Sequence, residues 1–212
     1  MNYYAQPITT TYNGYKFRSR TEAMWAVFFD AAGLPYDHEK EGFVLNDGTK
    51  YLPDFWLPSL KLWVEIKPKI DFVGSISLDA LPFSTPVIQQ LRSCELFQML
   101  RRFKNCQEWP VACVIGQPGK HRIWFFGWDM SESSGGEYED DNAIWCVANG
   151  QVTLDVHIKS PDREIYSDSL YGPVLEHFTY ARDHRYIVGP INDALKHARQ
   201  ARFEHGEKPE IR

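Results

Sequence analysis

The stretch from Tyr51 to Pro68 limits the fold more than any other part of this 212-residue chain. It consists of two short apolar runs separated by a proline and a serine, and each run carries an acidic side chain where a buried strand ordinarily has none. In the second run, three aliphatic residues alternate with Glu65, Lys67 and a tryptophan. Because a strand repeats every two residues, this pattern predicts that Glu65 and Lys67 point to the same face.

Asp54 lies in the first run, between Pro53 and Phe55. If the two runs pair as neighbouring strands, the carboxylates of Asp54 and Glu65 and the ammonium of Lys67 converge at one place. Burying such charges costs free energy unless a cation or hydrogen bonds compensate them. We therefore predict a functional cluster held by strands rather than by loops. The alternative is a surface salt bridge between edge strands, which contributes little to stability.

These residues resemble the signature of the PD-(D/E)XK nucleases, in which Pro53-Asp54 is followed after ten residues by Glu65-Ile66-Lys67. A helix carrying Glu22 and a first strand precede the motif, in the order seen in the resolvase-like and transposase-end-cleaving branches of that superfamily. Residues 12–68 are also similar to a group of uncharacterised phage and bacterial members with an Arg-Ser-Arg-Thr-Glu-Ala helix start. The resemblance is specific over roughly the first third of the chain.

The resemblance implies a restriction-endonuclease-like α/β sandwich, with a central mixed sheet flanked by helices, that cuts DNA. It implies that Asp54, Glu65 and Glu22 are catalytic and bind one or two metal ions, with the main-chain carbonyl of Ile66 as a further ligand. Lys67 would be catalytic by orienting a water molecule or steadying developing charge. Carboxylate oxygens without nearby thiolates favour Mg²⁺ or Mn²⁺ over zinc.

A helix is predicted from Ser19 to Gly33, because apolar residues recur at helical spacing between them. Ser19 as N-cap with Glu22 three residues later fits a capping box, in which the carboxylate satisfies main-chain donors without any metal. Glu22 therefore has two interpretations, as a cap or as a metal ligand. Arg18 and Arg20 flank it and are candidate phosphate contacts at the mouth of the site, or a solvated charged turn.

The remaining predicted elements follow from periodicity and turn residues. Residues 1–16 are expected to form an arm or an edge strand. Residues 37–40 are read as a solvated sheet face that includes His38. The elements of the core are a strand at 36–45 ending in a turn at 46–48, a loop at 68–86, a helix at 85–104, and strands at 109–115 and 122–128.

The run at 109–115 is uniformly apolar, which is typical of a parallel strand buried on both faces. We expect it to lie beside the motif strand, after the preceding helix. Gln90 on the polar face of that helix could hold a water or a phosphate, although a plain polar surface explains it as well. Lys69, two residues after Lys67, is a further candidate substrate contact.

Residues 1–130 are predicted to form the nuclease core and residues 131–212 an extension packed on it. The extension contains an acidic stretch at 131–141, interpreted as a solvated loop. Asn149-Gly150 between two apolar runs predicts a β-hairpin at 143–158. A helix is predicted at 191–204, where Lys196, Arg199 and Arg202 could grip a phosphate backbone or form a solvated face.

Net charge, the length of apolar runs and the spacing of cysteines exclude several classes of protein. A net charge of −5 argues against non-specific coating of nucleic acid, although it allows a local basic groove. No apolar run reaches the length of a membrane helix and residues 1–6 lack a signal pattern, so we expect a cytoplasmic protein without membrane contact. The four cysteines lack the spacing of a zinc site or a disulfide framework.

The predicted function is that of a metal-dependent deoxyribonuclease, with endonuclease or nickase activity favoured. Phage or mobile-element DNA processing, or host–phage conflict, is the expected setting, DNA is the expected partner, and a homodimer is compatible with the resemblance. The alternative keeps the fold without the reaction: a catalytically silent module that binds DNA or a protein, such as a phage-encoded antagonist of host defence.

Overall fold

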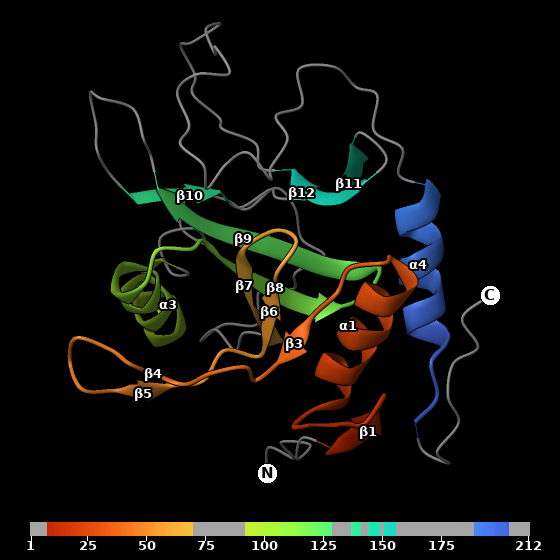
Figure 1. Ribbon diagram of the computed structural model, residues 1–212, viewed down its shortest axis with the longest axis horizontal. Coiled ribbons are helices and arrows are strands. Elements are labelled where there is room, and N and C mark those ends of the chain that lie inside the picture. The colour runs from red at the N-terminus through yellow and green to blue at the C-terminus, as the bar shows by residue number, and fades with distance from the viewer. Residues whose placement is uncertain are drawn as a thin grey trace, which may run out of the picture.

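The computed structural model describes residues 8–69, 92–128, 137–140, 144–148, 151–155 and 189–203 (Figure 1). A mixed six-stranded sheet, in the order β10-β9-β8-β7-β6-β3, forms its centre. The elements are β1 (Thr10–Tyr12), β2 (Tyr15–Phe17), α1 (Arg20–Ala31), β3 (Asp37–His38), β4 (Phe43–Val44), β5 (Lys50–Tyr51), β6 (Phe55–Leu57), β7 (Leu62–Lys67), α3 (Glu95–Cys106), β8 (Val111–Gln117), β9 (Lys120–Trp128), β10 (Glu137–Asp140), β11 (Ile144–Ala148), β12 (Gln151–Asp155) and α4 (Gly189–Gln200).

The motif strand β7 lies in the interior of the sheet. It pairs antiparallel with β6 and parallel with β8, where Glu65 lies opposite Cys113. This arrangement confirms the predicted parallel strand beside the motif strand. β3, β6 and β7 form an antiparallel series at one end of this sheet.

Apolar side chains cover both faces of the sheet, which makes the architecture a three-layer α/β arrangement. Val64 and Ile66 of β7 pack in a buried cluster with α1 and α4, whereas Trp63 packs with Phe103 of α3 in a second cluster. Figure 1 shows α1 and α4 on one side of the sheet and α3 on the other. By the two-residue period of β7, Glu65 shares the α3 side with Trp63.

The prediction of one continuous strand at 36–45 is wrong. β3 ends at His38, and the chain then leaves the sheet to form the separate two-stranded sheet of β4 and β5. Glu39 causes the break, because its φ of 46° is left-handed and incompatible with a continuing strand. Its amide donates to the main-chain oxygen of Asp54 at 3.0 Å, so the break holds the chain beside the motif.

Residues 10–17 form a β-hairpin where an arm or edge strand was expected. Asn13 and Gly14 both have positive φ, 47° and 83°, as a two-residue type I′ turn requires. The pair Asn13-Gly14 is therefore a sequence pattern that predicts this turn.

The long helix predicted at 85–104 is present in part: α3 spans Glu95–Cys106, and residues 70–91, with Gln90 among them, lie outside the described ranges. Among the described residues, no helix is long and apolar enough to cross a membrane. Cys94, Cys106 and Cys113 are free thiols, and only Cys113 of these three is fully buried.

In the C-terminal region the hairpin prediction is confirmed and the acidic-loop prediction is partly wrong. Glu137–Asp140 forms β10, which pairs antiparallel with β9 at the edge of the central sheet. The β11–β12 hairpin forms its own sheet, and its Trp145 and Leu154 join the buried cluster of α1. Helix α4 runs from Gly189 to Gln200 and ends four residues before the predicted end at 204.

Candidate active site

Asp54 and Glu65 face each other across two neighbouring strands. Asp54 directly precedes β6, and continuing the register in which Phe55 lies opposite Val64 places Asp54 opposite Glu65. Both side chains are buried, with 2% and 4% of their surface exposed. The cluster therefore lies in the interior, and the alternative of a surface salt bridge between edge strands is wrong.

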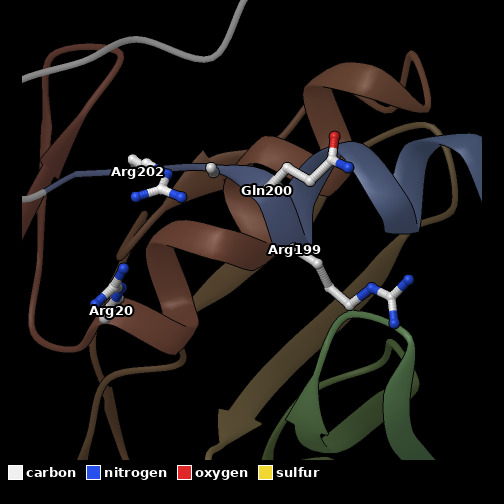
Figure 2. A pocket seen from close by; sticks show the side chains of 5 residues that line it. Arg20, Arg199, Gln200 and Arg202 are labelled. Atoms are coloured by element: carbon white, nitrogen blue, oxygen red, sulfur yellow. The ribbon is translucent and has the colours of Figure 1, made fainter.

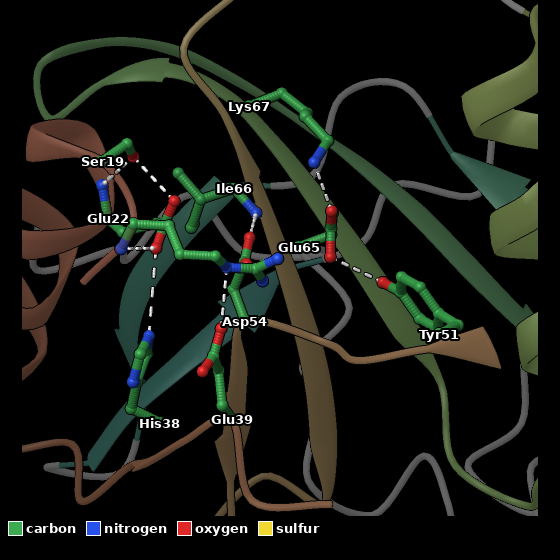
Figure 3. A network of polar contacts seen from close by, with 10 residues as sticks. Ser19, Glu22, His38, Glu39, Tyr51, Asp54, Glu65, Ile66 and Lys67 are labelled. Atoms are coloured by element: carbon green, nitrogen blue, oxygen red, sulfur yellow. Dashed lines mark hydrogen bonds and ion pairs between the residues drawn. The ribbon is translucent and has the colours of Figure 1, made fainter. Parts of the chain in front are cut away.

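Two donors hold the Asp54 carboxylate. The Ile66 amide donates to Oδ2 at 2.7 Å and the Arg18 guanidinium donates to Oδ1 at 2.9 Å (Figure 3). Burial, followed by the nearby charge of Glu65, raises the pKa of Asp54 well above its usual value. Ionising Asp54 is therefore costly in this position.

The Glu65 carboxylate is held by Tyr51 and Lys67. The Tyr51 hydroxyl donates to Oε2 at 2.6 Å, and the Lys67 ammonium donates to Oε1. Burial lowers the pKa of Lys67, but the charges of Glu65 and Asp54 outweigh it and raise the pKa overall. Burial and then Glu65 raise the pKa of Tyr51, so its hydroxyl stays a neutral donor. The predicted convergence of Asp54, Glu65 and Lys67 is thus present in the structure.

Glu22 forms the predicted cap with Ser19, but its carboxylate accepts from the Arg18 amide rather than from the amide of Ser19 itself. Its amide donates to Ser19 Oγ at 3.2 Å, and its carboxylate accepts from Ser19 Oγ at 2.7 Å and from the Arg18 amide at 3.1 Å. His38 Nε2 lies 3.9 Å from Glu22 Oε2. Burial raises the pKa of Glu22, but the contacts with His38, Ser19 and Arg18 outweigh it and lower the pKa.

His38 is not on a solvated sheet face, which corrects the prediction. Its side chain is 5% exposed, and its ring packs on that of Phe17 with 4.3 Å between centroids. The fold buries it because β3 pairs with β6 beneath the β1–β2 hairpin.

The candidate substrate contacts fall in different places. Arg18 bonds to protein carboxylates, to Asp54 and through Nε to Glu39 Oε1 at 2.7 Å, while its side chain is 57% exposed. Arg20 lines a separate pocket beside α4. Lys69 is exposed, two residues beyond Lys67. Sequence reasoning missed Tyr51 and Glu39, whose roles depend on contacts across strands.

The carboxylates of this cluster supply oxygen atoms, the kind of ligand that Mg²⁺ prefers in proteins. Four carboxylates each contact Arg18 or Lys67; they are Glu22, Glu39, Asp54 and Glu65. Across the described ranges, no three His, Cys, Asp or Glu side chains stand together as a ready ligand set. Mg²⁺, however, ordinarily uses one or two carboxylates and retains several waters.

Replacing Tyr51 by phenylalanine should weaken both the site and the fold. A buried carboxylate oxygen loses its donor, at a cost of about 1–3 kcal/mol in the free energy of unfolding. If Glu65 holds a metal ion, we expect a loss of roughly 10- to 100-fold in metal affinity, as for other residues that orient a metal ligand. Urea unfolding and metal titration measure the two effects. Tyr36→Phe, in the aromatic core near Phe29 and Phe55, is the matched control.

The two interpretations of Glu22 can be separated by comparing Ser19→Ala with Glu22→Gln. Removing the Ser19 cap should lower the free energy of unfolding by about 1 kcal/mol and leave metal affinity unchanged. If Glu22 is a metal ligand, Glu22→Gln should additionally weaken metal binding, measured by calorimetric titration. Equal metal affinity in the two variants would show that Glu22 caps the helix and does not bind metal.

Comparisons with protein-family models, with curated proteins and with solved structures found no match for this chain.

Proposed function

We propose that this protein is a metal-dependent nuclease of the restriction-endonuclease-like fold that hydrolyses phosphodiester bonds in DNA. The observation that carries the proposal is the burial of Asp54 and Glu65 opposite each other on adjacent interior strands, with Lys67 on the same face. Proteins seldom bury two facing carboxylates without a cation to neutralise them. The mixed sheet flanked by helices on both sides also supports this fold.

In this proposal Asp54 and Glu65 hold Mg²⁺ or Mn²⁺, with Glu22 and the Ile66 carbonyl as further candidates. When bound, the ion would act as a Lewis acid on a phosphodiester oxygen and lower the pKa of a water. Tyr51 keeps Glu65 oriented, and the Ile66 amide does the same for Asp54. Lys67, kept protonated by its two carboxylate neighbours, would stabilise the charge that develops on the phosphate.

The test is a divalent-metal titration followed by cleavage assays on plasmid, linear duplex and single-stranded DNA, with RNA as a fourth substrate. We expect metal binding in the absence of substrate and cleavage of at least one DNA substrate, abolished by a chelator. Metal binding without cleavage of any substrate would contradict the nuclease and favour a non-catalytic module.

One contact favours that second candidate. The guanidinium of Arg18 already donates to Asp54. An arginine of the protein itself can neutralise a carboxylate in place of a metal ion. If Arg18 has this role, Arg18→Gln should lower stability and create no gain in metal affinity. If Asp54 is a metal ligand, the same variant should bind Mn²⁺ more tightly than the wild type, because the competing cation is gone.

A further inference from the structure

Glu39 adopts a main-chain conformation that its position in the chain does not explain. Its φ of 46° is in the left-handed region, which residues with a Cβ rarely occupy. Among the described residues, the other non-glycine residues with positive φ are Asn13 and Lys61, and each lies in the connection between two paired strands. Glu39 follows β3, which does not pair with the next strand, β4. Such strain persists where the surrounding structure holds it, often at functional sites.

Two contacts hold Glu39 beside the motif. Its main-chain amide donates to the main-chain oxygen of Asp54 at 3.0 Å. Its carboxylate forms an ion pair with Arg18, in which Arg18 Nε lies 2.7 Å from Glu39 Oε1. Because the Glu39 side chain is only 27% exposed, water and salt screen this pair less than a fully exposed one. The strained conformation therefore places the Glu39 carboxylate at a fixed position next to Arg18.

The guanidinium of Arg18 has hydrogen-bond donors to spare. Its Nε bonds to Glu39, and its Nη2 donates to Asp54 Oδ1 at 2.9 Å. A guanidinium carries five N–H donors, and within the described ranges no residue accepts from Nη1. The Arg18 side chain is 57% exposed, whereas that of Asp54 is 3% exposed. Arg18 therefore connects the buried carboxylate to the protein surface and can bind one more acceptor there.

Glu39 would keep Arg18 in place when Asp54 no longer does. In the proposed function Asp54 binds a divalent ion, and Arg18 would be repelled by that ion because both are cations. Glu39 is the second carboxylate that contacts the Arg18 guanidinium, and it lies outside the strand pair that carries Asp54 and Glu65. It can thus retain the guanidinium beside the site. Guanidinium groups bind phosphate oxygens through paired hydrogen bonds, so the free donors of Arg18 suit a phosphate of the substrate.

We propose that Glu39 is a positioning residue: it holds Arg18 at the edge of the carboxylate cluster, where the guanidinium binds a phosphate of the DNA strand. This inference rests on the proposed nuclease function and deepens it, because it names the pair of residues that binds the substrate beside Asp54. Glu39 itself does not contact DNA and acts only through Arg18. A negatively charged side chain therefore increases the affinity of the protein for a negatively charged polymer.

The sign of this effect distinguishes it from ordinary electrostatics. Removing a negative charge usually strengthens binding to DNA, because repulsion between the protein and the phosphates decreases. Glu39→Gln should instead weaken DNA binding about five- to tenfold, since Arg18 loses the carboxylate that positions it. Glu41→Gln is the matched control: Glu41 is exposed two residues away, and its replacement should leave the affinity unchanged or increase it.

The experiment measures DNA affinity by fluorescence anisotropy with labelled duplex and single-stranded DNA, in a chelating buffer at about 50 mM salt. Every variant is made in the full chain carrying Asp54→Asn, called the parent, in which position 54 is uncharged, as neutralisation by an ion would leave it. Arg18→Gln should weaken binding at least as much as Glu39→Gln. Adding Glu39→Gln to Arg18→Gln should have no further effect, because Glu39 acts only through Arg18.

Two further variants test alternative explanations. Arg20 lines a separate pocket with Arg202 at the end of α4 (Figure 2), so Glu39→Gln should weaken binding by the same factor with or without Arg20→Gln. Glu39→Gly suits the φ of 46° and should be at least as stable as the parent in urea unfolding. It should nevertheless bind DNA as weakly as Glu39→Gln. A purely structural role would make stability and affinity fall together.

Four results would overturn the proposal. The first is DNA binding by Glu39→Gln and Glu39→Gly that is as tight as that of the parent. The second is a further loss of affinity when Glu39→Gln is added to Arg18→Gln. The third is displacement of DNA by inorganic phosphate at the concentration of DNA phosphate, since the ligand would then be a free anion. The fourth is the absence of measurable DNA binding by both the wild type and the parent.

Cleavage by the wild type in Mg²⁺ or Mn²⁺, measured separately, distinguishes this proposal from the nuclease itself. A wild type that cuts no DNA, with affinity lost in Glu39→Gln only while Arg18 is present, supports the pair and contradicts the nuclease. A wild type that cuts DNA, with Glu39→Gln binding as tightly as the parent, overturns the role of Glu39 and leaves the nuclease standing.

Discussion

Replacing Asp54 by asparagine should abolish metal-dependent cleavage of DNA. The amide keeps an oxygen for the Ile66 amide but removes the negative charge that would bind the ion. Metal-ion catalysis contributes several kcal/mol, so we expect the rate to fall by about three orders of magnitude or more. Asp37→Asn, a half-exposed aspartate on β3 beside Lys40, is the matched control and should retain the wild-type rate. A rate within tenfold of wild type for Asp54→Asn would exclude Asp54 as a metal ligand.

The same variant should be at least as stable as the wild type in a chelating buffer at neutral pH. Because the pKa of Asp54 is raised, the folded state holds this proton more tightly than the unfolded state. Stability must then fall as pH rises from the unfolded pKa toward the folded one, and the asparagine variant lacks that loss. Urea unfolding across this pH range measures the difference. Added Mg²⁺ should stabilise the wild type and leave Asp54→Asn unchanged, because only the former binds it.

Replacing Lys67 by methionine should separate catalysis from metal binding. Methionine retains most of the apolar stem but removes the charge that Lys67 holds beside Glu65. Loss of a group that stabilises transition-state charge typically lowers the turnover number by about 100- to 1,000-fold. The dissociation constant for Mn²⁺ should not weaken, since a competing cation has been removed from Glu65.

Single-turnover cleavage at saturating metal tests the Lys67 variant, with Lys50→Met as the control for an exposed lysine on the separate β4–β5 sheet. Since the charges of Glu65 and Asp54 raise the pKa of Lys67, its deprotonation should not limit wild-type cleavage at neutral pH. A variant that cuts at the wild-type rate would make Lys67 a purely structural counter-ion of Glu65.

The convergence of the motif could be predicted because it depends on local geometry. The two-residue period of β7 places Glu65 and Lys67 on one face, and the short connection from β6 forces an antiparallel neighbour that carries Asp54. The cap formed by Ser19 and Glu22 is equally local, since its partners lie within four residues. The Asn13-Gly14 turn carried the same kind of signal and was overlooked.

The contacts that tune the site could not be predicted in this way. Arg18 reaches Asp54 across 36 residues of sequence and Tyr51 reaches Glu65 across 14, and no periodic pattern marks either pair. The sequence also did not indicate β10. Its acidic residues predict a solvated loop, and only the pairing with β9 makes this segment a strand.

Short-range patterns alone thus specify the strands, the capped helix and the shared face of the motif, because hydrogen bonding and side-chain period act over a few residues. Three-dimensional packing settles the rest: which side chains hold each carboxylate, how deeply His38 is buried, and that Arg199 of α4 contacts the β8–β9 turn. Those features arise because the burial of apolar surface is favourable, and this favourable free energy does not depend on how far apart the residues are in the sequence.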